Sequence, residues 1–183
     1  MYHNTKKKQL ILVRHAHAIS VKDNGGDDYS RPLSKSGEKV ITIMVRYLGL
    51  IGIRPEMVLS STAKRAVMTA QYFVDRFHID SLQSIQALYD AYISWNSADH
   101  DLYVSLLRSV PDGMSTLLWV GHGENIEKCV EYFTGERMMH MEEGSLVVLT
   151  LKDHITSWEQ TGPGTMSIVY YLTPTFLKLE ELA

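Results

Sequence analysis

The sequence contains a single cysteine, Cys129, so the chain can form no internal disulfide. Its helical spacing from Ile126 and Phe133 predicts a buried thiol that packs as a small hydrophobic group. No apolar run approaches the roughly 20 residues that span a bilayer, and no N-terminal stretch resembles a signal peptide. The formal net charge is −3, which argues against a broad basic surface for nucleic acid. We therefore expect a reducing, cytoplasmic setting without nucleic-acid or membrane partners.

Linkers and repeats are also absent, and the 183 residues fit one domain. A hydrophobic content of 45% is ordinary for a globular chain of this length and provides a sizeable core. Three consecutive lysines, Lys6, Lys7 and Lys8, precede the first apolar segment. We expect residues 1–8 to form a flexible arm in front of a single domain.

Apolar runs of strand length alternate with amphipathic helical patterns along the chain. We expect strands at residues 9–13, 57–59, 116–120, 146–151 and 166–172. Helical spacing is found at residues 34–51, 63–77, 103–110 and about 124–134. This alternation predicts an α/β sandwich of three layers, in which helices cover both faces of a largely parallel sheet. The last two strands are expected to pair antiparallel at one edge.

Polar clusters follow three of the predicted strands directly. They are Arg14-His15, Ser60-Ser61 and Gly121-His122. In open α/β sheets, ligands bind beyond the carboxyl ends of the strands. The three clusters are therefore expected to meet at one edge of the sheet and form a site.

The residue types in these clusters favour phosphoryl chemistry. A neutral, oriented histidine such as His15 can act as a nucleophile. The guanidinium groups of Arg14 and Arg65 match phosphoryl oxygens with bidentate hydrogen bonds. We expect His122 to donate a further hydrogen bond to the phosphoryl group, best in its cationic form. The start of the helix carrying Arg65 is expected to add backbone N–H groups.

A metal site is the alternative interpretation of the first cluster. His15 and His17 occupy alternate positions, which two metal-ligating histidines of one strand would also do. Coordination usually needs three or four ligands, however, and the sequence offers no second histidine–carboxylate cluster. The neighbouring arginines would also repel a cation. We therefore expect no metal.

Four short motifs, spread over nearly the whole chain, carry a resemblance to a known family. They are Leu12-Val13-Arg14-His15-Ala16, Arg31-Pro32-Leu33-Ser34, Ser60 through Arg65-Ala66 to Thr69-Ala70, and Val120-Gly121-His122-Gly123. Together they resemble the motifs of the histidine phosphatase superfamily, whose fold is called phosphoglycerate mutase-like. The SixA-type phosphohistidine phosphatases are the most similar group.

The resemblance implies a role for each matching residue. His15 would carry the phosphoryl group as a phosphohistidine intermediate. Arg14, Arg65 and His122 would form the phosphate pocket together with Gly123, and Arg31 would lie at its rim or join it. The resemblance also implies that no cofactor or metal is needed.

The general acid is the least defined part of this expectation. Leu88-Tyr89-Asp90 resembles a Leu-Tyr-Glu segment of SixA-like chains, which makes Asp90 the first choice, although a solvated surface acid is an equal alternative. Glu124 is a second choice. Other departures are Ala16 in place of a glycine, Ser61 where many members have proline, and Glu124-Asn125 where Asn-Pro is frequent. The last of these puts substrate preference in doubt.

Only about forty residues separate the helix carrying Arg65 from the strand at residue 116, where larger relatives place a lid. We therefore expect an open pocket and a phosphorylated protein, most simply a phosphohistidine protein, as substrate. A small sugar or nucleotide ester is the alternative substrate. A phosphate-binding module without turnover is the alternative outside enzymes.

Overall fold

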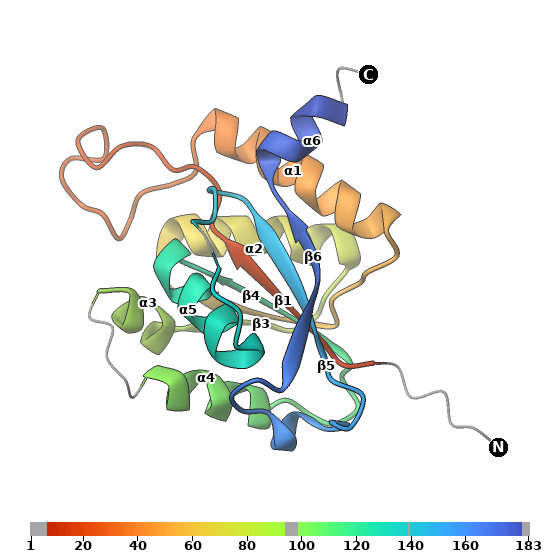
Figure 1. Cartoon of the computed structure of the whole chain (residues 1–183). Helices are drawn as coiled ribbons and strands as arrows, with labels where there is room; N and C mark the ends of the chain where they lie inside the picture. Colours follow the sequence, from red (N-terminus) through yellow and green to blue (C-terminus); the bar gives the residue numbers. More distant parts are fainter. Residues whose placement is uncertain (1–6, 94–98, 139, 181–183) are drawn as a thin grey trace.

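In the computed structural model, which describes residues 7–93, 99–138 and 140–180, the core is a six-stranded sheet (Figure 1). Its strands stand in the order β3-β2-β4-β1-β5-β6. Strands β3, β2, β4 and β1 are parallel, whereas β5 is antiparallel to both of its neighbours. The strands are β1 (Gln9–Arg14), β2 (Met57–Ser61), β3 (Leu82–Ile85), β4 (Thr116–Gly121), β5 (Leu146–Leu151) and β6 (Met166–Leu172).

Helices cover both faces of this sheet, which confirms the expected three layers. On one face lie α1 (Lys35–Leu50), α2 (Lys64–Phe77) and α6 (Pro174–Glu180). The other face carries α3 (Gln86–Ile93), α4 (Asp99–Arg108), α5 (Gly123–Thr134) and the short 3₁₀ helix η1 (Trp158–Gln160). The antiparallel edge formed by β5 and β6 is also as expected.

Strand β1 shows why its sequence is apolar at successive positions. Leu10 and Leu12 pack in the core beneath α4 and α5, while Ile11 and Val13 pack in the core beneath α1 and α2. Side chains alternate between the two faces of a strand, so a strand covered on both faces needs an uninterrupted apolar run. This burial fixes the register of β1, and therefore the position at which Arg14 and His15 leave the sheet.

The prediction that residues 1–8 form a flexible arm is wrong for Lys8. The Lys8 side chain is buried, and its Nζ donates hydrogen bonds to the carbonyls of Asp112 (2.8 Å) and Met114 (3.2 Å). Lys7 pairs with Asp153 at 2.7 Å on the surface. A lysine can be buried in this way because carbonyl oxygens satisfy its ammonium while its methylene groups pack against apolar neighbours. Residues 1–6 lie outside the described part of the chain.

Several elements escaped the sequence patterns because they are short or irregular. These are β3, α3 and α6, and the first residues of α4. Strand β3 has only four residues, and two of them are exposed, so it shows no apolar run. Within the described residues, no helix combines the length and apolar character required to cross a membrane.

Candidate active site

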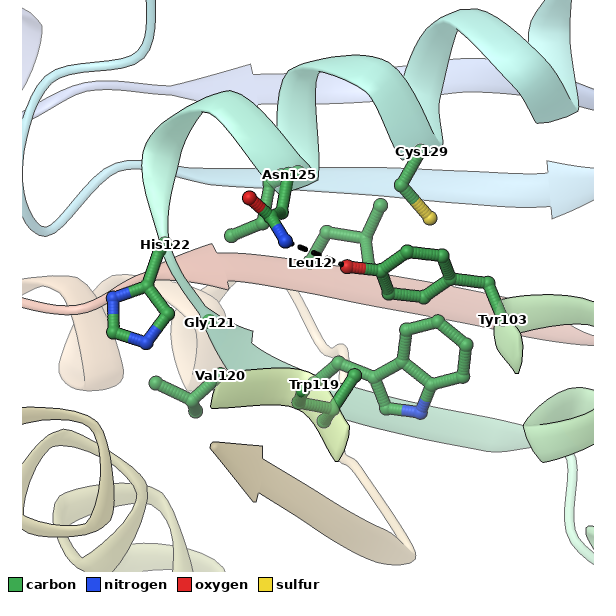
Figure 2. A pocket seen from close by; sticks show the side chains of 10 residues that line it. Leu12, Tyr103, Trp119, Val120, Gly121, His122, Asn125 and Cys129 are labelled. Carbon is green, nitrogen blue, oxygen red and sulfur yellow. Dashed lines mark hydrogen bonds between the residues drawn. The ribbon is translucent and has the colours of Figure 1, made fainter. Parts of the chain in front are cut away.

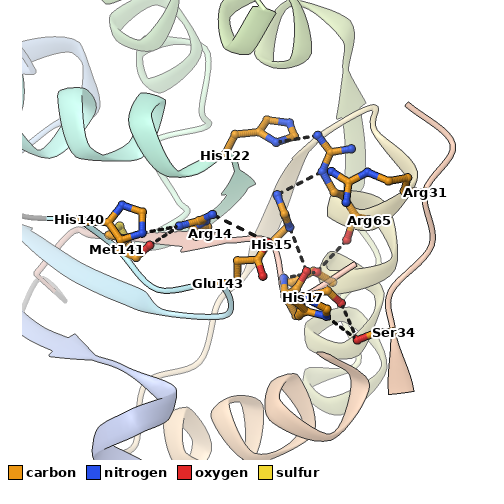
Figure 3. Close-up of polar contacts among 12 residues, drawn as sticks. Arg14, His15, His17, Arg31, Ser34, Arg65, His122, His140, Met141 and Glu143 are labelled. Carbon is orange, nitrogen blue, oxygen red and sulfur yellow. Dashed lines mark hydrogen bonds and ion pairs between the residues drawn. The ribbon is translucent and has the colours of Figure 1, made fainter. Parts of the chain in front are cut away.

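The three polar clusters meet at the carboxyl ends of β1, β2 and β4, as expected. Figure 3 shows Arg14, His15 and His122 together with Arg65. The ring centroids of His15 and His122 lie 5.2 Å apart. The Arg65 guanidinium reaches both rings from the first turn of α2. All three side chains are buried, with Arg65 completely shielded from solvent.

Two hydrogen bonds fix the ring of His15 and its tautomer. Nδ1 donates to the carbonyl oxygen of Ala16 at 2.9 Å. Arg65 Nε, which can only donate, points at Nε2 from 3.1 Å, so Nε2 carries the lone pair. Burial, reinforced by the nearby arginines, lowers the pKa of His15 to about 3. The ring is therefore neutral near pH 7, as a nucleophile requires.

Arg65 links the other components of the site. Its Nη1 donates to the carbonyl of Asp28 at 2.7 Å, and its Nη2 lies 3.1 Å from the Asp28 carboxylate and 3.4 Å from Nδ1 of His122. The hydroxyl of Thr69, one turn along α2, donates to the carbonyl of Arg65 and accepts the amide proton of Ala16. Arg65 thus contacts Nε2 of the His15 ring, and Thr69 holds Ala16, whose carbonyl accepts from Nδ1.

Both ring nitrogens of His122 have hydrogen-bond partners. Its Nδ1 accepts from Arg65, so Nε2 carries the proton and donates to the Ser61 hydroxyl at 2.9 Å. His122 also lines a largely apolar pocket together with side chains such as Leu12 and Tyr103 (Figure 2). Burial first, and then the positive charges nearby, lower the pKa of His122 to about 2. The buried His122 ring is therefore neutral near pH 7.

Helix α2 begins without a side-chain cap, because its N-cap is Ala63. The nearby Ser61 hydroxyl pairs with His122. The amide of Lys64 donates instead to the carbonyl of Tyr29 at 3.1 Å. This N–H group of α2 is therefore engaged by the β1–α1 loop.

Arg14 is held against the first turn of α5. Its Nη1 donates to the Met141 carbonyl, and its Nη2 lies 3.8 Å from the Glu143 carboxylate. A Cβ on Gly123 would lie 3.2 Å from Arg14 Cζ, so the glycine permits this close approach. Within the described part of the chain, Arg14 Nε is buried without a hydrogen-bond partner. Such a donor can be satisfied by an anion.

Arg31 joins the site through Asp28, on the loop between β1 and α1. Its Nε and Nη2 donate to one Asp28 oxygen at 2.9 and 2.7 Å, while the other oxygen faces Arg65. Burial alone would raise the pKa of Asp28, but the arginines outweigh it and lower that pKa. A carboxylate therefore bridges two of the arginines that were expected to bind phosphate.

The acid candidates lie on exposed surfaces. Asp90 is exposed on α3, where its carboxylate accepts a hydrogen bond from Gln86 at 2.8 Å. Glu124 is exposed in the first turn of α5. Helix α3 instead places two aromatic rings beside His122. The Tyr92 ring stacks on His122 with centroids 4.1 Å apart, and the Tyr89 ring lies at 5.9 Å. The acid role of Asp90 stays a prediction.

His17 does not accompany His15 into the site. Its ring is exposed, and Nδ1 lies 2.8 Å from the Ser34 hydroxyl at the start of α1. A Cβ on Gly37 would come within 2.1 Å of the His17 carbonyl oxygen, so α1 packs directly on this turn. Across residues 7–93, 99–138 and 140–180, no three His, Cys, Asp or Glu side chains are grouped to hold a metal ion.

Solved structures share this arrangement of strands and helices. The protein histidine phosphatase SixA, solved with tungstate, superposes with a TM-score of 0.75 at 20% identity, covering 92% of this chain and 99% of that one. The chain has the SixA fold. A SixA-assigned protein of Agrobacterium tumefaciens gives 0.72 at 24% identity, with coverages of 91% and 99%. These matches confirm the phosphoglycerate mutase-like architecture expected from the motifs.

The SixA fold is shared by enzymes with other substrates. A mycobacterial glucosyl-3-phosphoglycerate phosphatase superposes with a TM-score of 0.64 at 14% identity, covering 91% of this chain and 99% of that one. In sequence, an uncharacterized chloroplastic protein of Arabidopsis thaliana is 29% identical over 91% of this chain and 78% of its own length. No family model matches the sequence.

The sequence did not reveal the contacts through which four residues contribute to the site. Asp28 and Tyr92 lie in segments without a recognised pattern, and they reach the site only through the β1–α1 loop and through α3. Ser61 and Thr69 belong to the recognised motif around Arg65, but their partners, His122 and Ala16, come from other strands. Their presence in the motif was the one available signal.

Proposed function

We propose that this protein is a phosphohydrolase that transfers the phosphoryl group to His15 and then to water. The observation that carries the proposal is the state of His15. It is buried and neutral, and its Nε2 lone pair lies 3.1 Å from the Arg65 guanidinium. An oriented lone pair beside fixed positive charge is the arrangement that phosphoryl transfer to nitrogen requires.

In the first step, the Arg65 Nε–H turns from Nε2 to the phosphoryl oxygens, and the freed Nε2 lone pair attacks phosphorus and forms an N–P bond. The bond to the leaving group breaks, and its electron pair departs with that group. The ring then carries positive charge, which the Nδ1–H bond to the Ala16 carbonyl stabilises. In the second step, water attacks phosphorus and forms an O–P bond, losing a proton to solvent. The N–P bond breaks, its electron pair returns to Nε2, and inorganic phosphate leaves a neutral His15.

The cationic side chains have a defined task in both steps. Arg65 and Arg14, with its unpartnered Nε, would neutralise the phosphoryl oxygens. A bound phosphate dianion would also raise the pKa of His122 from its low value, so that the ring can donate to the phosphate as expected from the sequence. We propose that these groups suffice without a metal or other cofactor. Full turnover in excess EDTA would support that proposal.

The preferred substrate is a phosphohistidine on a protein. A histidine ring departs more easily than an alkoxide, so an arrangement with Asp90 and Glu124 on exposed surfaces suits it. A small phosphate ester is the second candidate, because glucosyl-3-phosphoglycerate phosphatase shares the fold. The complete set of Arg14, His15, Arg65 and His122 argues against a module without turnover. The cytoplasmic setting stays a prediction.

One experiment tests this function. The protein is incubated with a ³²P-phosphohistidine peptide and with a panel of phosphate monoesters, then quenched in alkali. We expect a phosphoryl adduct that is stable to base and labile to acid, and that is absent in His15→Ala. Ser34→Ala, a helix-cap change outside the cluster, is the control and retains the adduct. Phosphate binding without adduct or turnover would contradict the proposal.

A further inference from the structure

We propose that Tyr29, Tyr89 and Tyr92 form a leaving-group subsite that selects a planar aromatic group, such as an imidazole or a benzene ring, attached to the phosphoryl group. This inference rests on the proposed phosphohydrolase function and concerns what that site accepts. The three residues are called the tyrosine wall below. They come from the β1–α1 loop and from α3.

The tyrosine wall starts at the phosphate pocket and extends away from it. Tyr92 stacks nearly parallel on His122, with centroids 4.1 Å apart and ring planes 20° apart. Tyr89 stands edge-on to His122 at 5.9 Å. Tyr29 continues the series edge-on to Tyr89 at 4.9 Å. A group bonded to a phosphoryl between His15 and His122 therefore leaves the pocket beside these rings.

The residues at both ends of the wall are partly open to solvent. Tyr92 is 37% exposed and Tyr29 is 40% exposed. Exposed aromatic rings arranged in series at the mouth of a polar pocket provide apolar area that a ligand can cover. Helix α3 lies in the short connection that predicted an open pocket. Its tyrosines border one side of that pocket.

The charges around the wall favour an aromatic partner. The Arg65 guanidinium lies 5.6 Å from the centroid of Tyr92, which is a cation–π distance. Burial, together with the Asp28 carboxylate, raises the pKa of Tyr89, so its phenol stays neutral. Neutral rings offer edges and faces to another ring, and such pairs gain stabilisation beyond the area that they bury. A saturated ring of the same size covers similar area without this gain.

The test uses two esters that differ only in this property. Benzyl phosphate and cyclohexylmethyl phosphate both release a primary alcohol, so the chemistry of departure is closely matched. We expect kcat/KM to be about 3- to 10-fold higher for benzyl phosphate, the range that corresponds to one aromatic pair. Comparing kcat/KM for a phosphohistidine peptide and for a phosphotyrosine peptide then shows whether the preferred aromatic leaving group is an imidazole or a phenol.

Variants assign this preference to the wall. In Tyr29→Leu and Tyr92→Leu we expect the benzyl-to-cyclohexylmethyl ratio to fall toward one. Tyr29→Phe and Tyr92→Phe keep the rings and should keep the ratio. Tyr170→Leu removes a tyrosine that is 42% exposed on β6, and this control should also keep the wild-type ratio.

The outcomes separate this inference from the proposed function. Equal kcat/KM for the two esters in the wild-type protein, or a preference that survives both leucine variants, overturns the subsite while turnover upholds the phosphohydrolase. Absence of turnover and of the His15 adduct with every substrate overturns the proposed function itself. A preference that both leucine variants lose and both phenylalanine variants keep supports the subsite.

Discussion

Asp28 places a negative charge against two of the arginines proposed to bind phosphate, and Asp28→Asn tests the consequence. The substitution keeps the size of the side chain but removes its charge. Three charge-assisted contacts weaken: Nε and Nη2 of Arg31 at 2.9 and 2.7 Å, and Nη2 of Arg65 at 3.1 Å. The Asp28 side chain is 34% exposed, whereas Arg65 is completely buried.

Two opposite effects are expected from this substitution. Each contact to a charged partner loses roughly 1 kcal/mol when it becomes neutral, and solvent exposure of Asp28 reduces the sum, so unfolding free energy should fall by about 1–3 kcal/mol. Phosphate affinity should rise, because the anion no longer competes with a carboxylate for Arg65. Removing one nearby like charge is expected to strengthen binding by roughly 5- to 10-fold.

Urea unfolding with and without inorganic phosphate measures both effects. Bound phosphate stabilises the folded state by an amount that depends on its concentration relative to Kd, so Asp28→Asn should gain more than wild type. Asp27→Asn is the matched control, since it changes the net charge equally at the neighbouring residue, whose carboxylate accepts the Tyr29 amide. Equal phosphate affinity in wild type, Asp28→Asn and Asp27→Asn would refute competition by Asp28.

Three further predictions concern the buried groups of the site. The pKa values of His15 and His122 are about 3 and about 2 in the folded state and near 6.5 in the unfolded chain, which therefore binds more protons below pH 6.5. Folding stability should be unaffected by these rings above pH 6.5 and fall by up to about 1.4 kcal/mol per pH unit for each ring below it, as measured by urea unfolding at pH 7, 6 and 5. Arg65→Lys should lower kcat/KM by roughly 100-fold or more, because one ammonium cannot match the two hydrogen bonds of a guanidinium to the phosphoryl oxygens. Gly123→Ala places a Cβ 3.2 Å from Arg14 Cζ and should weaken phosphate binding several-fold in a calorimetric titration.

Each of these predictions has a control and a contrary result. His15→Asn should reduce the pH slope, whereas His154→Asn, an exposed site, should not; equal slopes in both variants would show that His15 is not responsible. For Arg65→Lys, retained kcat/KM with normal folding would remove Arg65 from the mechanism. Gly113→Ala, where an added Cβ meets nothing within 4 Å, is the control for Gly123→Ala, and equal phosphate affinity of the two variants would contradict the role of the close approach.

Much of the fold could be predicted because burial on both faces leaves a strong sequence pattern. Strands β1, β4 and β5 are buried on both faces and coincide closely with apolar runs. The edge strand β6 also matches an apolar run, although most of it is exposed. Helix α5 ends at Thr134 before Gly135, whose φ is 78°. Strand β3 could not be predicted, because it is short and half exposed. Lys8 was misassigned, because its partners are carbonyl oxygens more than a hundred residues away.

The sequence by itself determined most of the strands and helices and the strand ends that carry Arg14, His15 and His122. It did so because local periodicity and residue type depend only on near neighbours. Only the tertiary structure decided which nitrogen of His15 holds the lone pair, that His122 is neutral, and that Asp28 bridges Arg31 and Arg65. Those properties depend on burial and on partners from separate segments, and no local pattern encodes such contacts.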